Sequence, residues 1–296
     1  MQNKLSIKIP RPLAAGRFIL RVIMYELTIS IVTYKNNIRE LMRTVDSVLN
    51  SNLNLKLIIS DNSPTDTLRS LFNDSRIEYL YNEKNFGFGA GHNIAIKKIL
   101  NSSKYHLALN PDTYFNSDVL GKIVAFMDEN TQFGLFMPKI FYSDGSTSKV
   151  RRILPTLWDV FGKNLFPFLP YTKRSIITYS TDFFSYNKQC SIPFVSGSFL
   201  FFRTSELIKI GLFDERFFMY FEDTDISRRF YKHSKTVYYP RISISHIAHQ
   251  DSHHNLYLSI IHINSAIKYF NKWGWFFDKE RKIINKETLL QLGYKK

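Results

Sequence analysis

The sequence predicts an α/β fold, in which a mainly parallel sheet is flanked by helices. Segments with the pattern of buried strands alternate with segments of helical periodicity from residue 26 to residue 109, and such alternation builds parallel sheets. Of the 296 residues, 44% are hydrophobic and 16% are aromatic. This composition supplies enough apolar surface for a full core and excludes a chain that is disordered throughout.

The first part of the chain supplies the alternation. The predicted strands cover residues 27–33, 55–60, 76–81 and 105–109, and the predicted helices cover 38–49, 66–72 and 91–100. The pattern then loosens between Arg151 and Lys188, where three prolines exclude a long helix and predict an excursion from the sheet. It resumes with a strand-like run at 191–203, a helix from Ser205, a helix that ends near His233, a strand at 235–239 and a helical tail from Asn255.

These patterns predict three regions. Residues 1–24 carry five basic residues and no acid, and they are interpreted as a basic N-terminal arm, as a disordered tail or as the product of a mis-assigned start codon. Residues 25–252 form the main α/β domain, and residues 253–296 form a C-terminal helical extension.

The charge balance points to an anionic partner. Forty Lys and Arg against 25 Asp and Glu give a net charge of +15, which suits nucleic acid, an anionic membrane surface or a phosphorylated substrate. No run of about 18 apolar residues occurs, so an integral membrane protein is excluded. Cys190 is the single cysteine, which excludes an internal disulfide and a cysteine-rich zinc site and fits a reducing cytoplasm.

Polar residues follow each of the first four predicted strands. Parallel sheets bind ligands at the carboxyl ends of their strands, so these residues predict a ligand site, although each taken singly is also an ordinary turn or cap former. The four segments are 33–36, 61–63, 82–93 and 110–112. Within the third, Gly87, Gly89 and Gly91 could bring backbone N–H groups against a phosphate, but their spacing differs from the dinucleotide fingerprint and disfavours a nicotinamide enzyme.

Two later clusters carry reactive side chains. Glu222, Asp223 and Asp225 follow an aromatic run, where burial can raise a carboxyl pKa toward the range of a general base; Asp225 is also a candidate helix cap. Downstream, a histidine cluster suggests metal binding or proton transfer, although most of its members fit ordinary surface groups. It comprises His246, His249, His253 and His254, with Asp251.

Together these segments resemble family 2 glycosyltransferases of the GT-A fold, a Rossmann-like mixed sheet flanked by helices. The matching stretches run in the family's order and cover roughly residues 26–252. They are 29–36, 59–63, 85–93, 109–112, 197–203 and 211–225. Within the family, Asn110-Pro-Asp112, the 218–225 acidic segment and the 246–251 segment are most similar to bacterial O-antigen rhamnosyltransferases that act on lipid-diphosphate-linked N-acetylglucosamine.

The resemblance implies roles for individual residues. Asp223 is the expected catalytic base, with Glu222 second, in an inverting displacement. Asp112 and His246 are the expected ligands of Mg²⁺ or Mn²⁺, and Asn110 stands where the family usually has another acid. The expected nucleotide-sugar-binding residues are Thr33, Tyr34, Asp61, Asn85, Gly87, Gly91, Asn93, Asn110 and Asp112.

The resemblance also implies partners. The expected donor is dTDP-rhamnose, with a UDP-hexose or UDP-galactofuranose as the alternative, and the expected acceptor is an undecaprenyl-diphosphate-linked sugar. Arg151, Arg152 and Arg229 are expected to contact the acceptor or a diphosphate. The basic and aromatic residues of 151–174 and of the tail then suit an anionic membrane surface, and predict a cytoplasmic protein peripheral to the inner face of the bacterial cell membrane.

Two other functions account for part of the sequence. A basic nucleic-acid-binding protein would explain the charge, but Glu222, Asp223 and Asp225 would repel phosphate without a metal, and no nucleic-acid motif occurs, so no nucleic-acid partner is expected. A nucleotidyltransferase that makes the sugar nucleotide would use a sugar phosphate and a nucleoside triphosphate, and would release pyrophosphate.

Overall fold

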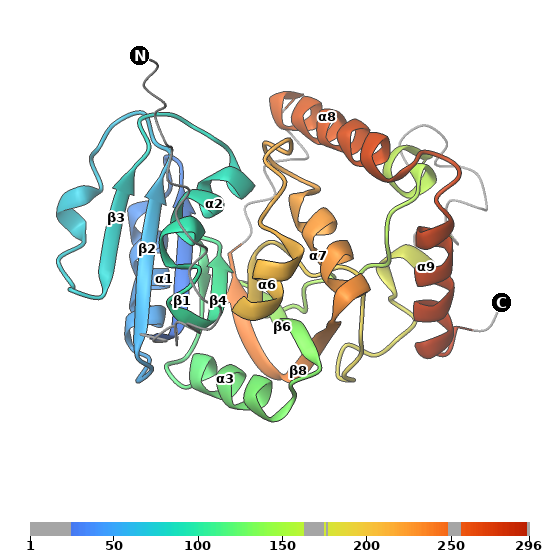
Figure 1. Cartoon of the computed structure of the whole chain (residues 1–296), viewed down its shortest axis with the longest axis horizontal. Coiled ribbons are helices and arrows are strands. Elements are labelled where there is room, and N and C mark those ends of the chain that lie inside the picture. Colours follow the sequence, from blue (N-terminus) through green and yellow to red (C-terminus); the bar gives the residue numbers. More distant parts are fainter. Residues whose placement is uncertain (1–24, 163–174, 176, 248–255, 295–296) are drawn as a thin grey trace, which may run out of the picture.

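The computed structural model describes residues 25–162, 175, 177–247 and 256–294, and its centre is one eight-stranded sheet (Figure 1). The strand order is β3-β2-β1-β4-β7-β6-β8-β5. The strands are β1 (Tyr25–Thr33), β2 (Leu55–Asp61), β3 (Ile77–Tyr81), β4 (Ser103–Leu109), β5 (Thr113–Tyr114), β6 (Phe133–Tyr142), β7 (Phe199–Arg203) and β8 (Lys235–His246).

The sheet is mixed. β1 to β4 run parallel to one another, as the alternation of strands and helices predicts. β7 is antiparallel to both β4 and β6, β8 is parallel to β6, and the short β5 pairs antiparallel with β8. The predicted α/β class and its mixed, Rossmann-like sheet are therefore confirmed. The carboxyl ends of β1, β2 and β4 lie at one edge of the sheet, where the predicted ligand segments follow.

Helices pack on the sheet and beside it. They are α1 (Ile38–Leu49), α2 (Phe88–Ile99), α3 (Val119–Glu129), α6 (Thr204–Ile210), α7 (Glu222–His233), α8 (Leu256–Trp273) and α9 (Lys279–Gln291). α1 begins where Asn37 caps it, since the Asn37 carboxamide accepts hydrogen bonds from the backbone N–H groups of Arg39 and Glu40. None of the described helices is long and apolar enough to span a bilayer.

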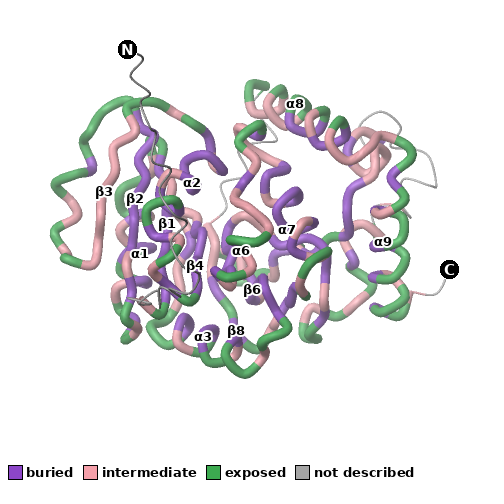
Figure 2. Tube along the Cα trace, viewed as in Figure 1, coloured by how far each residue is buried: buried purple, intermediate pink, exposed green. Residues whose placement is uncertain are grey.

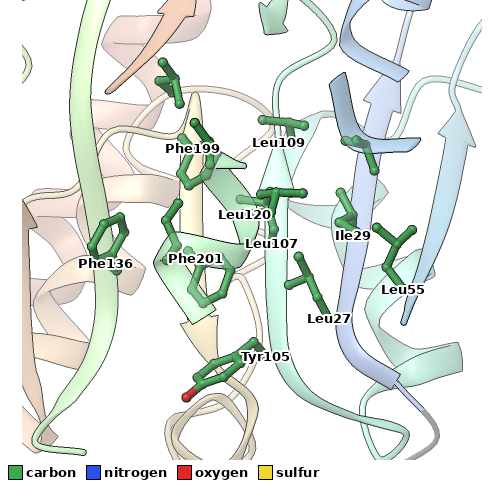
Figure 3. Packing of buried hydrophobic residues seen from close by; sticks show 14 of the residues in the cluster. Leu27, Ile29, Leu55, Tyr105, Leu107, Leu109, Leu120, Phe136, Phe199 and Phe201 are labelled. Atoms are coloured by element: carbon green, nitrogen blue, oxygen red, sulfur yellow. The ribbon is translucent and has the colours of Figure 1, made fainter. Parts of the chain in front are cut away.

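Four apolar clusters hold these elements together in the described part of the chain, and the smallest joins α2 to β2 through Ile58, Ala95 and Ile99. The largest joins α1 and α3 to the sheet through side chains such as Leu107 and Phe201 (Figure 3), and a second joins α6 and α7 to the sheet through Leu207 and Phe230. The third lies between α8 and the loop before α7, and its members include Phe217, Phe221, Ala266, Tyr269 and Phe270. Burial of such side chains contributes about 1.5–3 kcal/mol each, so α8 is bound to the loop that leads to the acidic cluster.

The helical extension is tied to the rest of the molecule by buried polar contacts. The Arg228 guanidinium on α7 donates to both carboxylate oxygens of Asp278, at 2.6 and 2.8 Å, just before α9 begins. The Asn285 carboxamide on α9 exchanges two hydrogen bonds with the backbone of Leu154. α8 and α9 therefore use their inner faces for structure, which agrees with the alternative interpretation of the tail, that its aromatic residues are core and its lysines are solvated.

Several predicted boundaries are corrected. Residues 66–72 form only a short 3₁₀ turn at Arg69–Leu71, and the strand-like run at 191–203 becomes a strand only at Phe199. The tail contains two helices, because Gly274 adopts φ of 101° after α8 and ends it. The N-terminal arm and part of the aromatic segment after Gly162 lie outside the described residues.

Candidate active site

A strained turn presents the acidic cluster. Tyr220 and Phe221 have φ of 69° and 67°, and helix α7 begins directly after them at Glu222. Two successive side-chain-bearing residues in the left-handed region cost about 1–3 kcal/mol each. Phe217 and Phe221 pack against α8, which holds this conformation in place. Strain of this kind is concentrated at functional sites, and here it immediately precedes the predicted base.

Asp223 is held as an oriented carboxylate. Its Oδ2 accepts the backbone N–H of Gly197 at 3.1 Å, and its Oδ1 accepts the N–H of Thr224 at 2.7 Å. Burial raises the pKa of Asp223, while these two N–H groups and the charge of Arg152 oppose that rise. The side chain remains partly exposed. These properties suit a base that meets a substrate hydroxyl.

Glu222 has a different environment. It is 5% exposed, and within the described part of the chain no group bonds to its Oε2. Burial, together with the neighbouring Asp223, raises the pKa of Glu222 well above its ordinary value. Glu222 is therefore favoured in its neutral form, and Asp223 is the better base of the two near neutral pH.

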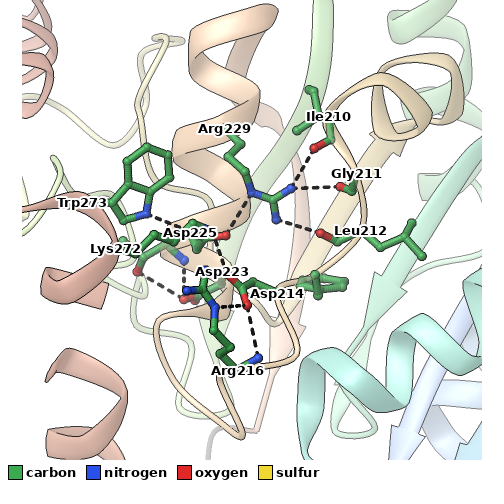
Figure 4. A network of polar contacts seen from close by, with 12 residues as sticks. Ile210, Gly211, Leu212, Asp214, Arg216, Asp223, Asp225, Arg229, Lys272 and Trp273 are labelled. Atoms are coloured by element: carbon green, nitrogen blue, oxygen red, sulfur yellow. Dashed lines mark hydrogen bonds and ion pairs between the residues drawn. The ribbon is translucent and has the colours of Figure 1, made fainter. Parts of the chain in front are cut away.

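Asp225 belongs to a structural network instead of a cap (Figure 4). It is fully buried, and its carboxylate accepts hydrogen bonds from the Trp273 indole at 2.8 Å and from Arg229 at 2.9 Å, and pairs with Lys272 at 2.6 Å. Because Lys272 and Trp273 end α8, Asp225 fixes α8 to the first turn of α7. The predicted alternative, an N-terminal cap, is wrong, since the cap position is Phe221.

The predicted metal ligands lie together. The carboxylate of Asp112 is 3.1 Å from Nε2 of His246, and the Asn110 carboxamide is 3.4 Å from the same nitrogen. The pairing of β5 with β8 sets Thr113 opposite His246 and so makes this contact. Among the described residues no group of three or more acids, histidines or cysteines could enclose a cation. An acid and an imidazole fit a cation that takes its remaining ligands from a diphosphate and water.

A short turn connects the acid–histidine pair to the base. The backbone N–H of Asn110 bonds to the carbonyl of Ser198 at 3.1 Å, and the neighbouring Gly197 donates to Asp223. Residues 196–198 thus contact both the 110–112 segment and the acidic cluster. Gly197 was not predicted as a site residue. Its backbone N–H bonds to a side chain 26 residues further along the chain, and no local sequence pattern marks such a contact.

At the end of β1 and β2, one of three predicted base-binding residues is exposed. Tyr34 is 47% exposed, whereas Thr33 and Asp61 are fully buried. Asp61 accepts hydrogen bonds from the Thr33 hydroxyl at 2.9 Å and from the Tyr79 hydroxyl at 2.6 Å. The polar atoms of Thr33 and Asp61 thus support the strand ends from within, and contact of these two residues with the nucleotide stays a prediction.

The glycine-rich turn docks on the loop before the acidic cluster. The carbonyl of Phe218 accepts the N–H of Phe88 at 2.9 Å and caps α2, and a Cβ on Gly87 would lie 2.0 Å from that carbonyl oxygen. Glycine at 87 is therefore required by this close approach, and its φ is 87°. The Phe218 carbonyl, and not a phosphate, meets the start of α2.

The other residues of this turn have structural partners as well. Asn85 accepts the N–H of Gly87, and a Cβ on Gly91 would lie 2.8 Å from the side chain of Val32. The Asn93 carboxamide is buried and exchanges hydrogen bonds with the backbone of Phe213 at 2.9 and 3.0 Å. Gly87 and Asn93 therefore hold the 213–221 loop, and Gly91 lets α2 lie close to β1; contact of the three residues with the donor stays a prediction.

Only one of the three predicted acceptor-contacting arginines faces the site. Arg151 is fully buried, where it bonds to the carbonyl of Ser185 and lies 3.7 Å from the Tyr186 ring centre. Arg229 bonds to the carbonyls that end α6, from residues 210–212. Contact of Arg151 or Arg229 with the acceptor or a diphosphate stays a prediction. Arg152 is exposed between two rings, and its charge acts on Asp223.

Several predicted residues lie outside the described part of the chain. They comprise His249, Asp251, His253 and His254 of the histidine cluster, and Lys163, Phe166, Phe168, Tyr171, Lys173 and Arg174 of the basic aromatic segment. His246, at the end of β8, is the member of the cluster that the structure describes.

Comparisons with known proteins agree with this geometry. The family model described as "Glycosyl transferase family 2" matches residues 28–211. The chain is 24% identical over 209 residues to the low-salt glycan biosynthesis hexosyltransferase Agl10 of Haloferax volcanii, covering 69% of this chain and 61% of that protein. It is also 24% identical over 208 residues to the rhamnosyltransferase WbbL of Escherichia coli K12, covering 67% and 74%.

Solved structures share the fold at low identity. GalNAc-T7, crystallised with UDP, GalNAc and Mn²⁺, superposes with a TM-score of 0.57 at 17% identity, over 76% of this chain and 43% of that one. TarS of S. aureus superposes with a TM-score of 0.56 at 16% identity, over 90% and 43%. The fold is that of GT-A transferases. Because the family model covers more than half of the chain, the protein belongs to glycosyl transferase family 2.

Proposed function

We propose that this transferase moves L-rhamnose from dTDP-rhamnose to N-acetylglucosamine on a polyprenyl diphosphate, with inversion, in the synthesis of O-antigen or a related cell-surface polysaccharide. The observation that carries the reaction type is the turn at residues 196–198, which bonds to the base Asp223 on one side and to the 110–112 segment on the other. The turn places the proposed base Asp223 near the proposed diphosphate-binding pair Asp112 and His246, and this arrangement suits a direct displacement.

Asp223 is the catalytic base in this proposal. It accepts the proton of the acceptor hydroxyl as that oxygen attacks the anomeric carbon of the donor. Attack comes from the face opposite to the leaving diphosphate, which inverts the anomeric carbon. The N–H groups of Gly197 and Thr224 keep the carboxylate oriented and favour its ionised form. Glu222 is the alternative base.

Asp112 and His246 are the proposed ligands of a divalent cation. When bound there, Mg²⁺ or Mn²⁺ would stabilise the negative charge that develops on the leaving diphosphate. The imidazole nitrogen favours Mn²⁺, since Mg²⁺ prefers ligands that are all oxygen. Asn110, whose carboxamide lies 3.4 Å from the same nitrogen of His246, is proposed to contact the nucleotide sugar. Tyr34 is the exposed residue proposed to meet the nucleotide base.

The choice of sugar is supported by one relative. WbbL is named a rhamnosyltransferase and Agl10 a hexosyltransferase, which favours a hexose or deoxyhexose donor. A UDP-hexose or UDP-galactofuranose is the alternative donor. A lipid-diphosphate acceptor also accounts for the net charge of +15, and would locate the protein on the cytoplasmic face of the cell membrane, with Arg152 close to the acceptor.

A donor and acceptor panel tests the proposal. Purified protein with Mn²⁺ is supplied with dTDP-rhamnose, UDP-glucose, UDP-galactose or UDP-galactofuranose and a synthetic lipid-diphosphate N-acetylglucosamine, and the products are weighed by mass spectrometry. We expect the mass of one deoxyhexose to be added from dTDP-rhamnose. Addition of another sugar would overturn the donor assignment alone, and no product from any donor would overturn the acceptor assignment. Release of pyrophosphate from a nucleoside triphosphate would instead favour the nucleotidyltransferase.

A further inference from the structure

Helix α8 exposes a continuous apolar stripe. Leu256, Ile260, Ile263 and Ile267, here called the α8 stripe, are 78%, 56%, 47% and 38% exposed. At 100° per residue they fall within an arc of about 60° along about 16 Å of helix. Figure 2 shows exposed residues along α8, in contrast to the buried strands of the sheet. Scattered exposed apolar residues need no explanation, but a stripe on one helix face indicates a binding surface.

The turn after α8 exposes two more large apolar side chains. Phe276 and Phe277, here called the Phe tip, are 77% and 96% exposed. They follow Trp275 and precede Asp278, which is buried and paired with Arg228. The backbone beside the Phe tip is therefore anchored, and two aromatic rings project from a fixed base.

The charges around this surface suit an anionic partner. From Leu256 to Phe277 the chain contains no Asp or Glu. The first two acids after it, Asp278 and Glu280, pair with Arg228. On α9 the exposed charged residues are Lys279, Lys282 and Lys286, with one exposed acid, Glu287. A segment of exposed apolar side chains that contains no acid and is followed by a surplus of lysine is typical of segments that lie in the headgroup region of an anionic bilayer.

The opposite face of α8 contacts the loop that leads to the base. The hydroxyl of Ser265 donates to the carbonyl of Met219 at 2.7 Å, and the Lys268 amine donates to the carbonyl of Arg216. Tyr269 packs on Phe221, with ring centres 5.4 Å apart. A partner bound to the outer face of α8 would thus lie one helix diameter, about 10 Å, from the 216–221 loop.

We propose that the α8 stripe and the Phe tip are a docking surface for an anionic phospholipid bilayer, which holds the 216–221 loop at the headgroup level where a lipid-linked acceptor presents its sugar. The proposal rests on the lipid-linked acceptor of the proposed function. In this proposal the four side chains of the α8 stripe and the two of the Phe tip contact the bilayer. Helix α8 inserts partly into its surface, and no segment spans it.

Vesicle sedimentation of the full chain tests the proposal without donor or acceptor. The variants are Ile260→Gln/Ile263→Gln in the stripe and Phe276→Ser/Phe277→Ser in the tip, and the matched control is Ile208→Gln, a 44% exposed isoleucine on α6. Wild type and control should bind phosphatidylglycerol vesicles far better than phosphatidylcholine vesicles. Each double variant should lose at least about tenfold in partitioning, since two large apolar side chains leave the interface.

Two outcomes would overturn the docking surface. One is equal partitioning of wild type and both double variants. The other is a wild type that ignores vesicles but forms a dimer that the stripe variants dissociate, which would make a second copy of the chain the partner. Because vesicle binding needs no sugar, failure of the donor or acceptor assignment leaves this result unchanged. Equal melting temperatures of all four proteins, measured by circular dichroism, show that the variants are folded.

Discussion

Neighbouring carboxylates at residues 222 and 223 have different tasks because their surroundings differ. Asp223 receives two backbone N–H groups and the charge of Arg152, whereas the Oε2 of Glu222 has no bonding partner among the described residues. Environments that separate the pKa values of two acids are a means of assigning acid and base roles. Asp223, whose ionised form is favoured by these neighbours, is the proposed base, and Glu222 is a buried acid that is tolerated at a cost in stability.

Replacing Glu222 by Gln should stabilise the protein at neutral pH. Burial and the neighbouring Asp223 raise the pKa of Glu222 in the folded protein. The contribution of neutral Glu222 to the free energy of unfolding is therefore complete below the unfolded pKa of about 4.5, and it is lost as the pH rises through the folded pKa. Gln keeps the shape and removes this loss. The melting temperature of the Glu222→Gln variant should exceed that of the wild type at pH 8 by more than at pH 5.

The exposed acid Glu129 provides the control. Glu129→Gln should leave the melting temperature unchanged at both pH values. A Glu222→Gln variant that melts below the wild type at pH 8 would mean that Glu222 is charged and bonded in the native protein.

Replacing His246 by Ala should weaken metal binding. His246 lies 3.1 Å from Asp112, and the pair provides the proposed cation ligands. We expect at least about a tenfold increase in the Mn²⁺ concentration needed for half-saturation. Electron paramagnetic resonance of Mn²⁺ in the presence of dTDP measures this without turnover. His233→Ala, at an exposed histidine, is the control; equal Mn²⁺ binding in both variants would remove His246 from the site.

Single residues could be predicted where their contacts are short-range or where a motif marks them. Asp223, Asp112 and His246 were predicted, and the last two are indeed adjacent. Arg151 and Arg229 were assigned to the acceptor, but they bond to carbonyls 17–34 residues away in the chain. The sequence pattern cannot distinguish an arginine that bonds to the carbonyls at the end of another helix from one that binds a ligand, because the neighbouring residues in the sequence are similar in both cases.

At the scale of elements, the clamp between α7 and the C-terminal helices is the contact most sensitive to substitution. Arg228 and Asp278 are 1% and 3% exposed and form a bidentate pair. Asp278→Ala would leave Arg228 buried with only Glu280 beside it and would remove the cap of α9. We expect a loss of about 3–5 kcal/mol in the free energy of unfolding, measured by urea titration.

An exposed pair provides the comparison for the clamp. Asp118 and Lys122 form an ion pair on α3 with side chains that are 55% and 62% exposed. Asp118→Ala should cause little measurable change, because exposed pairs are screened by solvent. If Asp278→Ala is as stable as Asp118→Ala, α8 and α9 are not held by the clamp.

Elements were predictable where propensity and burial agree. The parallel strands β1, β2 and β4 and the helix α1 follow the pattern closely. β6 was missed because Gly134 and Pro138 interrupt its apolar run, yet the structure tolerates Pro138 at an irregularity in the pairing with β8. The 191–198 run was read as a strand, but its residues form the turn that reaches Asp223, and the tertiary contact overrides local propensity.

At the scale of the whole molecule, a buried hydrogen-bonded chain crosses the centre of the sheet. His92 on α2 bonds to the Ser30 hydroxyl at 2.7 Å, and Ser30 bonds to His106 at 2.9 Å. His106 bonds in turn to Thr28 at 3.0 Å. Burial lowers the pKa of His106 to about 3 and that of His92 well below 6.5. Both imidazoles are neutral in the native protein.

This chain should make the protein less stable in acid. The pKa of each histidine is lower in the folded protein than in the unfolded chain, where it is about 6.5. The contribution of each neutral histidine to the free energy of unfolding is therefore complete above pH 6.5 and is lost as the pH falls toward the folded pKa. The loss is up to about 1.4 kcal/mol per pH unit for each histidine. His106→Gln removes one such group, so its unfolding free energy should fall less between pH 6.5 and pH 5 than that of the wild type. Urea titration at several pH values measures the two slopes.

The exposed His233 serves as the control for this slope. His233→Gln should retain the pH dependence of the wild type. A His106→Gln variant with the wild-type slope would mean that His106 is already protonated in the native protein.

The molecule as a whole was predictable in class and in the position of the site. The sheet edge at the ends of β1, β2 and β4 was expected from the alternation alone, and the charge of +15 pointed to an anionic partner. The packing of α8 on the 216–221 loop and the clamp between α7 and the start of α9 were not, since Arg228 and Asp278 are 50 residues apart and neither has a distinctive sequence context. Contacts of this range are decided by the whole fold.

The most direct test of the account is the rate of sugar transfer by Asp223→Asn, beside Asp118→Asn as a distant isosteric control. We predict that loss of the general base lowers the rate by about 10²–10⁴-fold, while binding of the nucleotide-sugar donor, measured by calorimetry, stays close to that of the wild type. Transfer by Asp223→Asn at a rate within a few-fold of the control would contradict the account, because it would remove the base from Asp223 and leave the strained turn before it without a catalytic reason.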